Sequence, residues 1–552
     1  MRFRAVVSMA AAASIGTVAV GAEAAQASGP PRVPAAAARP GGMPAGFVPG
    51  EALVRFRPAT SAADEARANR VAGGTVTKSF DLAVPGLRMV RLAPGVGVDA
   101  ALARYRSSPA VLYAEPNRVW GLAVGRVTVP NDPQFPTQWD WNNTGQIGGK
   151  PDADVDAPEA WDHTTGDHSV VVAVIDTGID YRHPDLKANV WNNTAECQGI
   201  PGVDDDGNGY IDDCHGIDTI NGDSDPIDDL GHGTHVSGTI GAVGNNGKGV
   251  TGMNWSVQIM ACKSHDAAGN ATTASVIECF QYVQMEKQRF GVDVVATNNS
   301  WGGCPEACGY SRALRDAIAG QLSVGILTVA AAGNNGSNND TTPFYPAGYY
   351  LPNVIAVAAT TNRDALASFS DFGARTVSVG APGQDVYSTL PGDAYGYLSG
   401  TSMASPHVAG LAALIAAQDP SLDWRAIRNL ILAGGDPKGS VAGTTITGTR
   451  INADGSLTCS GVPVFGVLRP LESEPLGGPL TVAALNIDCA AAAGGLTVTI
   501  DPGGTTLALH DRGRRPDLAK GDGVYSGSWT PSAAGTYTLS FSNGQTATVV
   551  VG

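Results

Sequence analysis

SVVVAVIDTG, residues 169–178, is a nearly continuous apolar run that ends beside an acidic side chain, Asp176. Runs of this kind are typical of parallel strands that helices cover on both faces. Four more runs follow at 256–263, 292–302, 325–334 and 353–360, and helical patterns lie between them, including 272–288 and 310–322. The sequence therefore predicts an α/β fold with an open, mostly parallel sheet from about residue 129 to 457.

Different patterns flank this region on both sides. Upstream, residues 51–117 follow the order βαββαβ, which predicts a small ferredoxin-like domain over 49–121. Downstream of Cys459 the helical patterns stop, and short alternating strands with Gly, Asn, Asp and Pro turns predict an Ig-like β-sandwich over 460–552. A chain of 552 residues is long enough for these separate cores.

The N-terminus has the features of a secretory signal. Two arginines precede a small-residue apolar run, and an Ala-x-Ala site at residues 25–27 predicts removal of residues 1–27. A membrane anchor is the alternative, but polar residues interrupt the run and leave it short of a comfortable span. The Pro/Gly/Ala-rich residues 28–48 are expected to form a linker. We therefore expect a secreted, extracellular protein with no membrane partner.

Charge and cysteine content narrow the class of protein further. The formal net charge is −16 and no long basic cluster is present, which argues against a nucleic-acid partner. Eight cysteines in an exported chain are most simply interpreted as disulfides. Neighbouring cysteines predict three short loops: Cys197 with Cys214, Cys304 with Cys308, and Cys459 with Cys489. Cys262 and Cys279 either pair or remain buried thiols.

Several polar side chains stand where predicted strands end or helices begin, which is where active sites lie in open α/β sheets. Each also has a structural interpretation. Asp176 could start a turn, Asn334 could be a loop residue, and Ser402 could cap the helix that follows it, with Pro406 in the first helical turn. His232 and His235 resemble half of a zinc site, but the glutamate of an H-E-x-x-H motif is missing.

Together, four of these side chains supply what acyl transfer to water requires. A serine hydroxyl needs a neutral imidazole to take its proton, and the imidazole needs a carboxylate to fix its tautomer. The oxyanion of the tetrahedral intermediate needs donors, which an Asn side chain and a backbone N–H at a helix start can provide. Ser402, His232, Asp176 and Asn334 match these roles.

Five motifs carry a resemblance to a known family: VIDTGID, GHGTHVSGTI, NNSWGG, AAAGNNG and GTSMASPHVAG, in this order. With them the chain resembles the subtilisin-like serine peptidases, the subtilases, over about 129–457. The resemblance implies that Ser402 is the nucleophile, His232 the general base and then acid, Asp176 the orienting carboxylate and Asn334 an oxyanion donor, with His235 structural. It also implies that Ser300, Trp301 and Gly302 form one wall of the substrate pocket, and that residues 49–121 are an inhibitory prodomain.

Two other hydrolase classes do not fit. An α/β-hydrolase would have G-x-S-x-G and the order Ser, Asp, His, whereas Ala404 replaces the last glycine and the order here is Asp, His, Ser. An aspartic peptidase needs two carboxylates that share a proton, and the sequence has one Asp-Thr-Gly. A catalytically inactive binding or adhesive protein with the subtilase fold remains the alternative.

The acidic stretch DDDGNGYIDDCHGID, from residue 204, resembles a calcium-binding loop. Acidic and amide side chains alternate before a glycine at the sharp turn, although His215 stands where an EF-hand has its bidentate glutamate. The predicted Ca²⁺ ligands are Asp204, Asp206, Asn208, the Tyr210 carbonyl, Asp212 and Asp213. A solvated acidic loop is the alternative. A second acidic run at 221–232 either binds an ion or is solvated, and the Asp-rich loop at 510–523 is a weaker candidate.

These observations lead to one hypothesis. We expect a secreted, monomeric serine endopeptidase that acts on proteins or peptides and carries structural calcium without an organic cofactor. We expect it to be made as a precursor whose prodomain is an intramolecular inhibitor, removed by a self-processing cut between Gly121 and Gln138.

Overall fold

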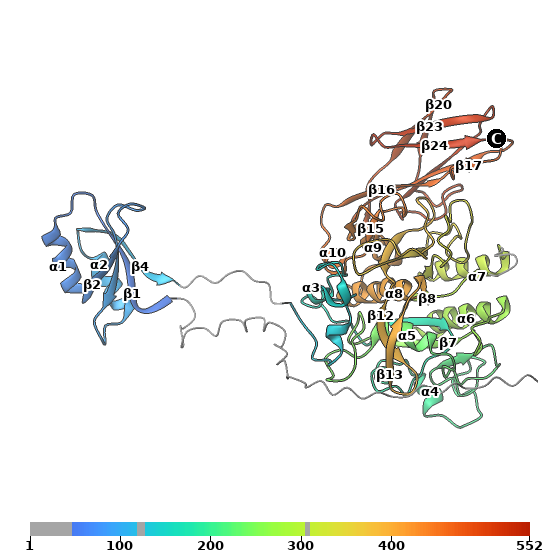
Figure 1. Cartoon of the computed structure of the whole chain (residues 1–552), viewed down its shortest axis with the longest axis horizontal. Helices are drawn as coiled ribbons and strands as arrows, with labels where there is room; N and C mark the ends of the chain where they lie inside the picture. Colours follow the sequence, from blue (N-terminus) through green and yellow to red (C-terminus); the bar gives the residue numbers. More distant parts are fainter. Residues whose placement is uncertain (1–46, 119–126, 304–309) are drawn as a thin grey trace, which may run out of the picture. The chain divides into compact units, whose positions relative to one another are not determined.

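The computed structural model describes residues 47–118, 127–303 and 310–552 (Figure 1). The chain divides into two compact units, residues 1–125 and 126–552. Three predictions concern segments outside the described residues: the signal peptide, the linker up to residue 46, and the Cys304–Cys308 pair. The first part of the expected processing range, 121–126, also lies outside them.

The N-terminal unit has the predicted βαββαβ order. Its elements are β1 (Phe47–Phe56), α1 (Ala62–Ala72), β2 (Gly74–Ser79), β3 (Leu87–Leu92), α2 (Val98–Arg106) and β4 (Val111–Arg118). The four strands pair antiparallel in the order β2-β3-β1-β4. Alternate residues of β1, Ala52, Val54 and Phe56, are buried against α1 and α2. The inward-facing residues of the strand and of the two helices therefore form one hydrophobic core.

The second unit is built on a nine-stranded sheet with the order β14-β15-β11-β10-β9-β8-β5-β7-β6. Every neighbouring pair is parallel except β14 with β15, which confirms the predicted mostly parallel sheet. The strands are β5 (Val171–Asp176), β6 (Gly216–Asp218), β7 (Gln258–Lys263), β8 (Val294–Asn299), β9 (Leu327–Ala331), β10 (Val354–Thr360), β11 (Val379–Pro382), β14 (Asp436–Pro437) and β15 (Thr449–Arg450).

Helices cover both faces of this sheet (Figure 1). Val172 and Val174 of β5 belong to a core with α5 (His232–Gly241), α8 (Thr401–Gln418) and α9 (Trp424–Ala433). Val171, Ala173 and Ile175 belong to a second core with α6 (Thr273–Met285) and α7 (Arg312–Ser323). The β5 run is continuous in apolar residues because alternate side chains enter different cores.

Shorter elements connect these layers. They are η1 (Phe135–Thr137), η2 (Gln146–Gly148), α3 (Ala157–Ala160), α4 (Thr194–Cys197), η3 (Glu286–Phe290), α10 (Ala453–Leu457) and the hairpin of β12 (Val386–Leu390) and β13 (Ala394–Leu398). None of the helices in the described ranges is long and apolar enough to cross a membrane.

The C-terminal part forms two sheets that share one core. One contains β16 (Pro463–Arg469), β18 (Leu480–Asp488), β19 (Ala491–Ala492) and β22 (Val524–Trp529). The other has the order β17-β24-β23-β20-β21, with β17 (Ser473–Glu474), β20 (Leu496–Asp501), β21 (Thr505–Leu509), β23 (Gly535–Phe541) and β24 (Thr546–Val551).

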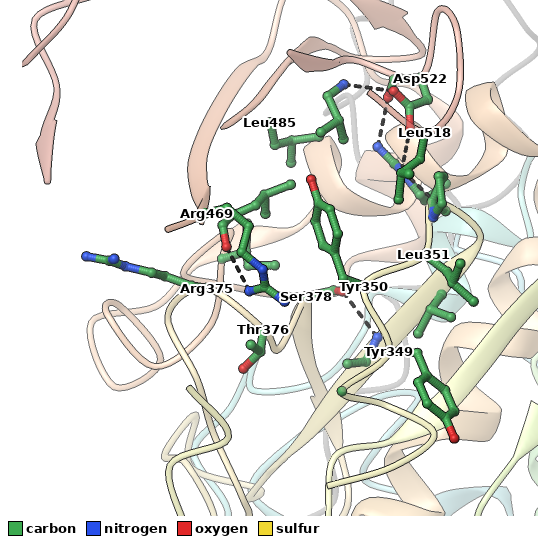
Figure 2. Close-up of a pocket in the computed structure, with 18 of the residues that line it drawn as sticks. Tyr349, Tyr350, Leu351, Arg375, Thr376, Ser378, Arg469, Leu485, Leu518 and Asp522 are labelled. Carbon is green, nitrogen blue, oxygen red and sulfur yellow. Dashed lines mark hydrogen bonds and ion pairs between the residues drawn. The ribbon is translucent and has the colours of Figure 1, made fainter. Parts of the chain in front are cut away.

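Arginines join these C-terminal sheets to the nine-stranded part around a small cavity of about 80 Å³ (Figure 2). Arg428 of α9 donates to the carbonyl oxygens of Pro352, at 2.9 Å, and Asp522, at 2.8 Å. Arg375 donates to the carbonyl oxygens of Pro470 and Thr548. Because buried guanidinium groups need acceptors, these contacts make the two parts depend on each other.

Three disulfides lie in the described residues. The predicted pairs Cys197–Cys214 and Cys459–Cys489 are confirmed. Cys262 pairs with Cys279, which settles the choice that the sequence left open. This third bond joins the buried strand β7 to helix α6.

Candidate active site

One cleft of about 600 Å³ gathers the four residues that the sequence singled out. Asp176 is the last residue of β5, His232 the first of α5 and Ser402 the second of α8, while Asn334 follows the end of β9. Strands β5, β8 and β9 are parallel neighbours, so their carboxyl ends open at the same edge of the sheet. The cleft lies at that edge, where an open α/β sheet is expected to hold its site.

Asp176 and His232 form a close pair. Nδ1 of His232 donates to Oδ1 of Asp176 at 2.7 Å, and the N–H of Thr177 donates to the same oxygen at 2.8 Å. Burial alone would raise the pKa of Asp176, but the charge and hydrogen bond of His232, with smaller contributions from His265 and the N–H of Thr177, together outweigh it and hold that pKa below its usual range. Burial likewise favours neutral His232, yet the Asp176 charge and hydrogen bond raise the pKa of His232.

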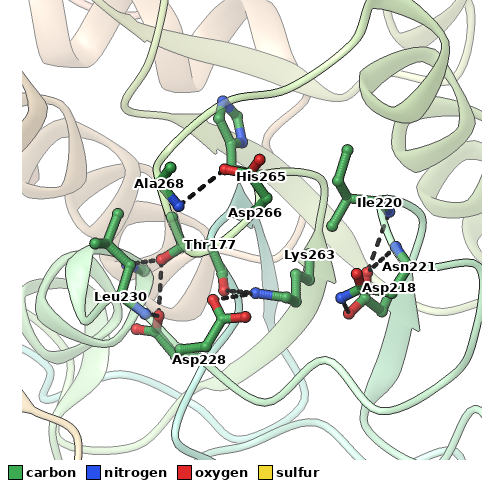
Figure 3. Close-up of polar contacts among 12 residues, drawn as sticks. Thr177, Asp218, Ile220, Asn221, Asp228, Leu230, Lys263, His265, Asp266 and Ala268 are labelled. Atoms are coloured by element: carbon green, nitrogen blue, oxygen red, sulfur yellow. Dashed lines mark hydrogen bonds and ion pairs between the residues drawn. The ribbon is translucent and has the colours of Figure 1, made fainter.

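Asp228 fixes the loop that leads into His232 (Figure 3). Its buried carboxylate accepts hydrogen bonds from the N–H groups of Leu230, Gly231 and Thr234 and from the hydroxyls of Thr177 and Thr234. Since Thr177 directly follows Asp176, this carboxylate holds both members of the Asp176–His232 pair in place.

Lys263 anchors the same loop from the end of β7 (Figure 3). Its side chain is 1% exposed, and Nζ donates to the carbonyl oxygen of Thr177 at 2.7 Å and to Oδ1 of Asp229 at 2.6 Å. A buried ammonium group with two oxygen acceptors is a rigid support for the residues around Asp176.

Ser402 does not cap its helix. Helix α8 begins at Thr401 after Gly400, which has no side chain to cap it, and Pro406 stands in its second turn rather than its first. The Ser402 hydroxyl donates to the carbonyl oxygen of Ser300 at 2.8 Å. No hydrogen bond joins Ser402 to His232 in the part of the chain that the structure describes. Such contacts often form fully only when substrate is bound.

Pro406 has a structural consequence for Ser402. Proline has no N–H to donate to the carbonyl oxygen four residues earlier, which is that of Ser402. This free carbonyl accepts a hydrogen bond from Oγ of Ser300 at 2.7 Å. Asn298 connects the contact to the helix interior, since its Nδ2 donates to Ser300 Oγ at 2.9 Å and its Oδ1 accepts from Ser405 at 2.8 Å. The end of β8 and the start of α8 are therefore locked together.

Thr401 orients Asn334. Oδ1 of Asn334 accepts from the N–H of Thr401 at 2.8 Å and from its hydroxyl at 3.0 Å. The carbonyl end of the amide thus faces α8, and Nδ2 is left as a donor on the exposed side. The N–H of Ser402, in the first turn of α8, has no acceptor within its own helix. Two donors consequently stand near the Ser402 hydroxyl.

Ser300, Trp301 and Gly302 line the same cleft. They follow the end of β8 at Asn299 and precede the residues outside the described range. The Trp301 ring lies 5.7 Å from that of His265, which also lines the cleft. His235, by contrast, is buried under β12 and β13, where its Nε2 contacts the carbonyl oxygens of Val386 and Gly396. Burial lowers the pKa of His235 to about 4, so this side chain is neutral at pH 7.

The acidic loop from residue 204 assembles a different set of carboxylates from the one that its spacing predicted. Asp206 and Asp213 meet Glu196 of α4, with ligand oxygens within 4.8 Å of one another. Nδ2 of Asn208 donates to Asp213 at 2.9 Å and to Glu286 of η3 at 3.4 Å. Burial and the charges of Asp213 and Asp206 raise the pKa of Glu286 to about 7.

The other predicted ligands are used differently. Asp204 accepts N–H groups from residues 207–209 and so closes the turn, and Oδ2 of Asp212 accepts the N–H of Gly202. The ring of Tyr210 packs edge-on against Tyr282. Sequence reasoning missed Glu196 and Glu286 because they come from separate elements. It also missed Thr401 and Asp228, although both lie close in the sequence to Ser402 and His232, and that was the available signal.

Comparisons with known proteins give a consistent result. Residues 167–442 match the subtilase family, and residues 33–117 match the fervidolysin N-terminal prodomain. The chain is 36% identical over 372 residues to the thermophilic serine proteinase of Bacillus sp. (strain AK1), covering 67% of this chain and 79% of that protein. It is 36% identical over 292 residues to thermitase of Thermoactinomyces vulgaris, covering 53% and 87%. It is 38% identical over 262 residues to subtilisin DY of Bacillus licheniformis, covering 47% and 81%.

Proposed function

Since this chain belongs to the subtilase family and is a serine-type endopeptidase with an N-terminal prodomain, we propose that Ser402, His232 and Asp176 are its catalytic triad. The observation that carries the proposal is the 2.7 Å hydrogen bond between His232 and Asp176, in a cleft that Ser402 also lines. The family members named above are serine proteases, which supports the same chemistry.

In this mechanism His232 takes the proton of Ser402 as Oγ attacks the scissile carbonyl carbon. For this step the Ser402 hydroxyl leaves the Ser300 carbonyl and turns toward Nε2 of His232. Asp176 keeps the proton on Nδ1, which leaves Nε2 as the base, and stabilises the imidazolium that forms. His232 then gives the proton to the leaving amine, and water hydrolyses the acyl-enzyme by the same steps in reverse order.

The negative charge on the carbonyl oxygen develops beside two donors. Nδ2 of Asn334 is free because Thr401 holds the carbonyl end of the amide, and the N–H of Ser402 is free because it lies in the first helical turn. Donors that are already oriented need no reorganisation during the reaction, which is why such groups lower the barrier. Ser300, Trp301 and Gly302 are proposed to guide an extended substrate backbone alongside.

We also extend the proposal to the life cycle of the protein. A signal at 1–27, a prodomain at 49–121, a catalytic domain at 129–457 and an Ig-like β-sandwich at 460–552 fit a monomeric enzyme that is secreted as an inactive precursor. The independent core of the N-terminal unit supports a prodomain that folds by itself. Self-processing between Gly121 and Gln138 would then release activity against protein and peptide substrates.

Substitution of Ser402 tests the proposed function. Ser402→Ala should reduce kcat/KM on an unfolded protein substrate by at least about 10⁴-fold, because no nucleophile remains. It should also leave the prodomain attached when other proteases are absent. A serine-directed phosphonylating reagent should label the wild type at Ser402 and leave Ser402→Ala unlabelled. Unchanged hydrolysis by Ser402→Ala would contradict the assignment, and loss of the prodomain from that variant would contradict self-processing.

We propose a structural Ca²⁺ at the carboxylates of Glu196, Asp206, Asp213 and Glu286, of which all but Asp206 are buried. None of these four forms an ion pair with a Lys or Arg side chain among the described residues, so their mutual repulsion is offset only by uncharged donors, such as the Tyr282 hydroxyl on Asp213, and by the charge of Arg289 near Glu286. Carboxylate oxygens are the ligands that a hard divalent cation prefers, and these residues would hold it. A bound cation would supply the missing positive charge and tie the loop to α4 and η3.

A further inference from the structure

Two backbone segments flank the cleft beside Ser402, and both lack side chains where they face each other. One follows β8 and includes Gly302 and Gly303, and the other follows β9 and includes Gly333. Glycine walls leave room for a guest side chain between them. Because the first segment starts at Ser300 and the second ends at Asn334, this slot opens next to the Ser402 hydroxyl and the proposed oxyanion donor.

The ring of Phe344 already occupies the slot. A methyl group on Gly302 or on Gly303 would come within 2.5 Å of the Cε1 and Cε2 atoms of this ring, and one on Gly333 would lie 3.1 Å from its Cγ. The ring therefore touches both walls. Phe344 is half-buried and is one of the residues that line the cleft, so its ring presents a solvent-facing surface to a substrate.

Backbone contacts hold this ring in place. The N–H of Gly303 donates to the carbonyl oxygen of Tyr345 at 2.9 Å, which ties the Phe344 segment to the glycine wall. The N–H of Gly348 donates to the carbonyl oxygen of Phe344 at 2.7 Å and closes a turn. Tyr345 also packs on Tyr349, with 4.6 Å between ring centroids. These contacts fix the backbone that carries the ring, and the glycine walls on both sides contact the ring itself.

On the proposed function, the peptide carbonyl carbon joins Ser402 Oγ while its oxygen faces Asn334. The side chain of that same residue, the one before the scissile bond, must then enter the glycine-walled slot. Since the Phe344 ring lies between the glycine walls, we propose that Phe344 restricts this position to small side chains, namely Gly, Ala and Ser. The self-processing cut within 121–138 follows a small residue for the same reason.

Peptide p-nitroanilides that differ in the residue before the scissile bond test this inference on the processed full-chain enzyme. The wild type should cleave the Ala substrate with a kcat/KM about 100-fold above that of the Phe substrate, a range typical of steric selection by a pocket. Phe344→Gly and Phe344→Ala should bring the Phe substrate to within about 10-fold of the Ala substrate. Phe344→Tyr, which keeps the ring, should retain the wild-type preference.

Phe290→Ala provides the matched control, because Phe290 is an exposed aromatic residue outside the cleft and should leave the preference unchanged. A wild-type enzyme that prefers Phe or Leu would overturn the inference without any variant. So would Phe344 variants that fold and cleave with the wild-type preference. If the proposed function itself were wrong, the result would be distinguishable from these outcomes. The wild type would then cleave no substrate of the series, and its activity would equal that of Ser402→Ala.

Discussion

Thr401 shows how one side chain decides which atom of another faces the site. Both its N–H and its hydroxyl donate to Oδ1 of Asn334, and its Oγ1 also accepts the N–H of Gly333 at 3.1 Å. An amide has a donor end and an acceptor end, so the contact that holds the acceptor end also turns the donor end outward. Thr401 is fully buried and therefore offers this contact in a single geometry.

Replacing Asn334 should lower kcat with little change in KM. We expect Asn334→Leu to lose about 10²–10³-fold in kcat, the loss typical of removing one oxyanion donor in this family. Thr401→Val should lose about 10-fold, because the amide is then free to turn its oxygen toward the oxyanion. Thr401→Ser keeps the hydroxyl and should restore kcat. Steady-state kinetics on one peptide substrate checks all three variants, and a rise in KM at constant kcat would instead mean that Asn334 binds the ground state.

The pKa of His232 predicts the acid limb of the activity profile. The Asp176 charge raises the pKa of His232 above the value of about 6.5 for a free imidazole. Only the neutral imidazole accepts the Ser402 proton, so kcat/KM should be lost as pH falls through this raised pKa and should rise between about pH 6 and 8. A pH profile with a neutral peptide substrate measures it. Constant kcat/KM across that range would exclude His232 as the base.

At the scale of elements, the acidic loop is completed by its neighbours. Helix α4 contributes Glu196, η3 contributes Glu286 and the loop contributes Asp206 and Asp213. The Cys197–Cys214 disulfide joins α4 to the end of the loop. Four carboxylates from three elements repel one another, and the proposed Ca²⁺ would offset that repulsion and hold the three elements together.

Removal of calcium should therefore lower the melting temperature. An ion that binds only the folded state stabilises it by about 2.7 kcal/mol at a free concentration 100 times its Kd. We expect a chelator to lower the Tm of the wild type by several degrees, and Asp213→Asn to have a low Tm that the chelator no longer changes. Asp316→Asn, at an exposed position on α7, is the control and should keep the full chelator effect. Differential scanning calorimetry with and without Ca²⁺ would contradict the proposal if the wild-type Tm did not change.

Elements were predictable from the sequence where one local pattern determines them. The continuous apolar run before Asp176 and the similar runs up to residue 360 all contain strands of one sheet. A strand that is buried on both faces must be apolar at nearly every position, so its sequence is easy to identify. Contacts between distant loops have no such pattern. The approach of Glu286 to Asp213 and the entry of Phe344 between glycine walls follow from tertiary packing, which spacing along the chain does not encode. The capping role considered for Ser402 was wrong because the helix begins at Thr401, two residues earlier than a cap at Ser402 requires.

At the scale of the whole molecule, the C-terminal sheets depend on the nine-stranded part. Arg428 lies 5% exposed, and besides its two carbonyl acceptors it faces the carboxylate of Asp522 at 3.6 Å. Burial raises the pKa of Asp522 to about 6, with the Arg428 charge acting against that shift. The guanidinium of Arg469 lies over the ring of Tyr350, 4.7 Å from its centroid. These contacts favour a mature enzyme that keeps residues 460–552.

Arg428 provides the test of this dependence. Arg428→Met should lower the free energy of unfolding by about 3–5 kcal/mol, because it leaves Asp522 buried without its counter-charge and two carbonyl oxygens without donors. Arg425→Met is the matched control on the same helix, where the side chain is 34% exposed and pairs with an exposed Asp423. It should change stability by less than about 0.5 kcal/mol. Urea unfolding followed by tryptophan fluorescence measures both, and equal stability of the two variants would show that the arginine contacts do not couple the parts.

The Cys459–Cys489 disulfide affects how well this protease resists cleavage by other molecules of the same protease. The bond closes a loop that contains β16, β17 and the whole of β18. A single nick anywhere within that loop leaves both new chain ends attached to the same molecule, so no fragment diffuses away. The strand pairs can then re-form around the break. Cuts confined to this loop therefore release at most the segment between them, and residues 490–552 stay bonded to the rest of the molecule through Cys489.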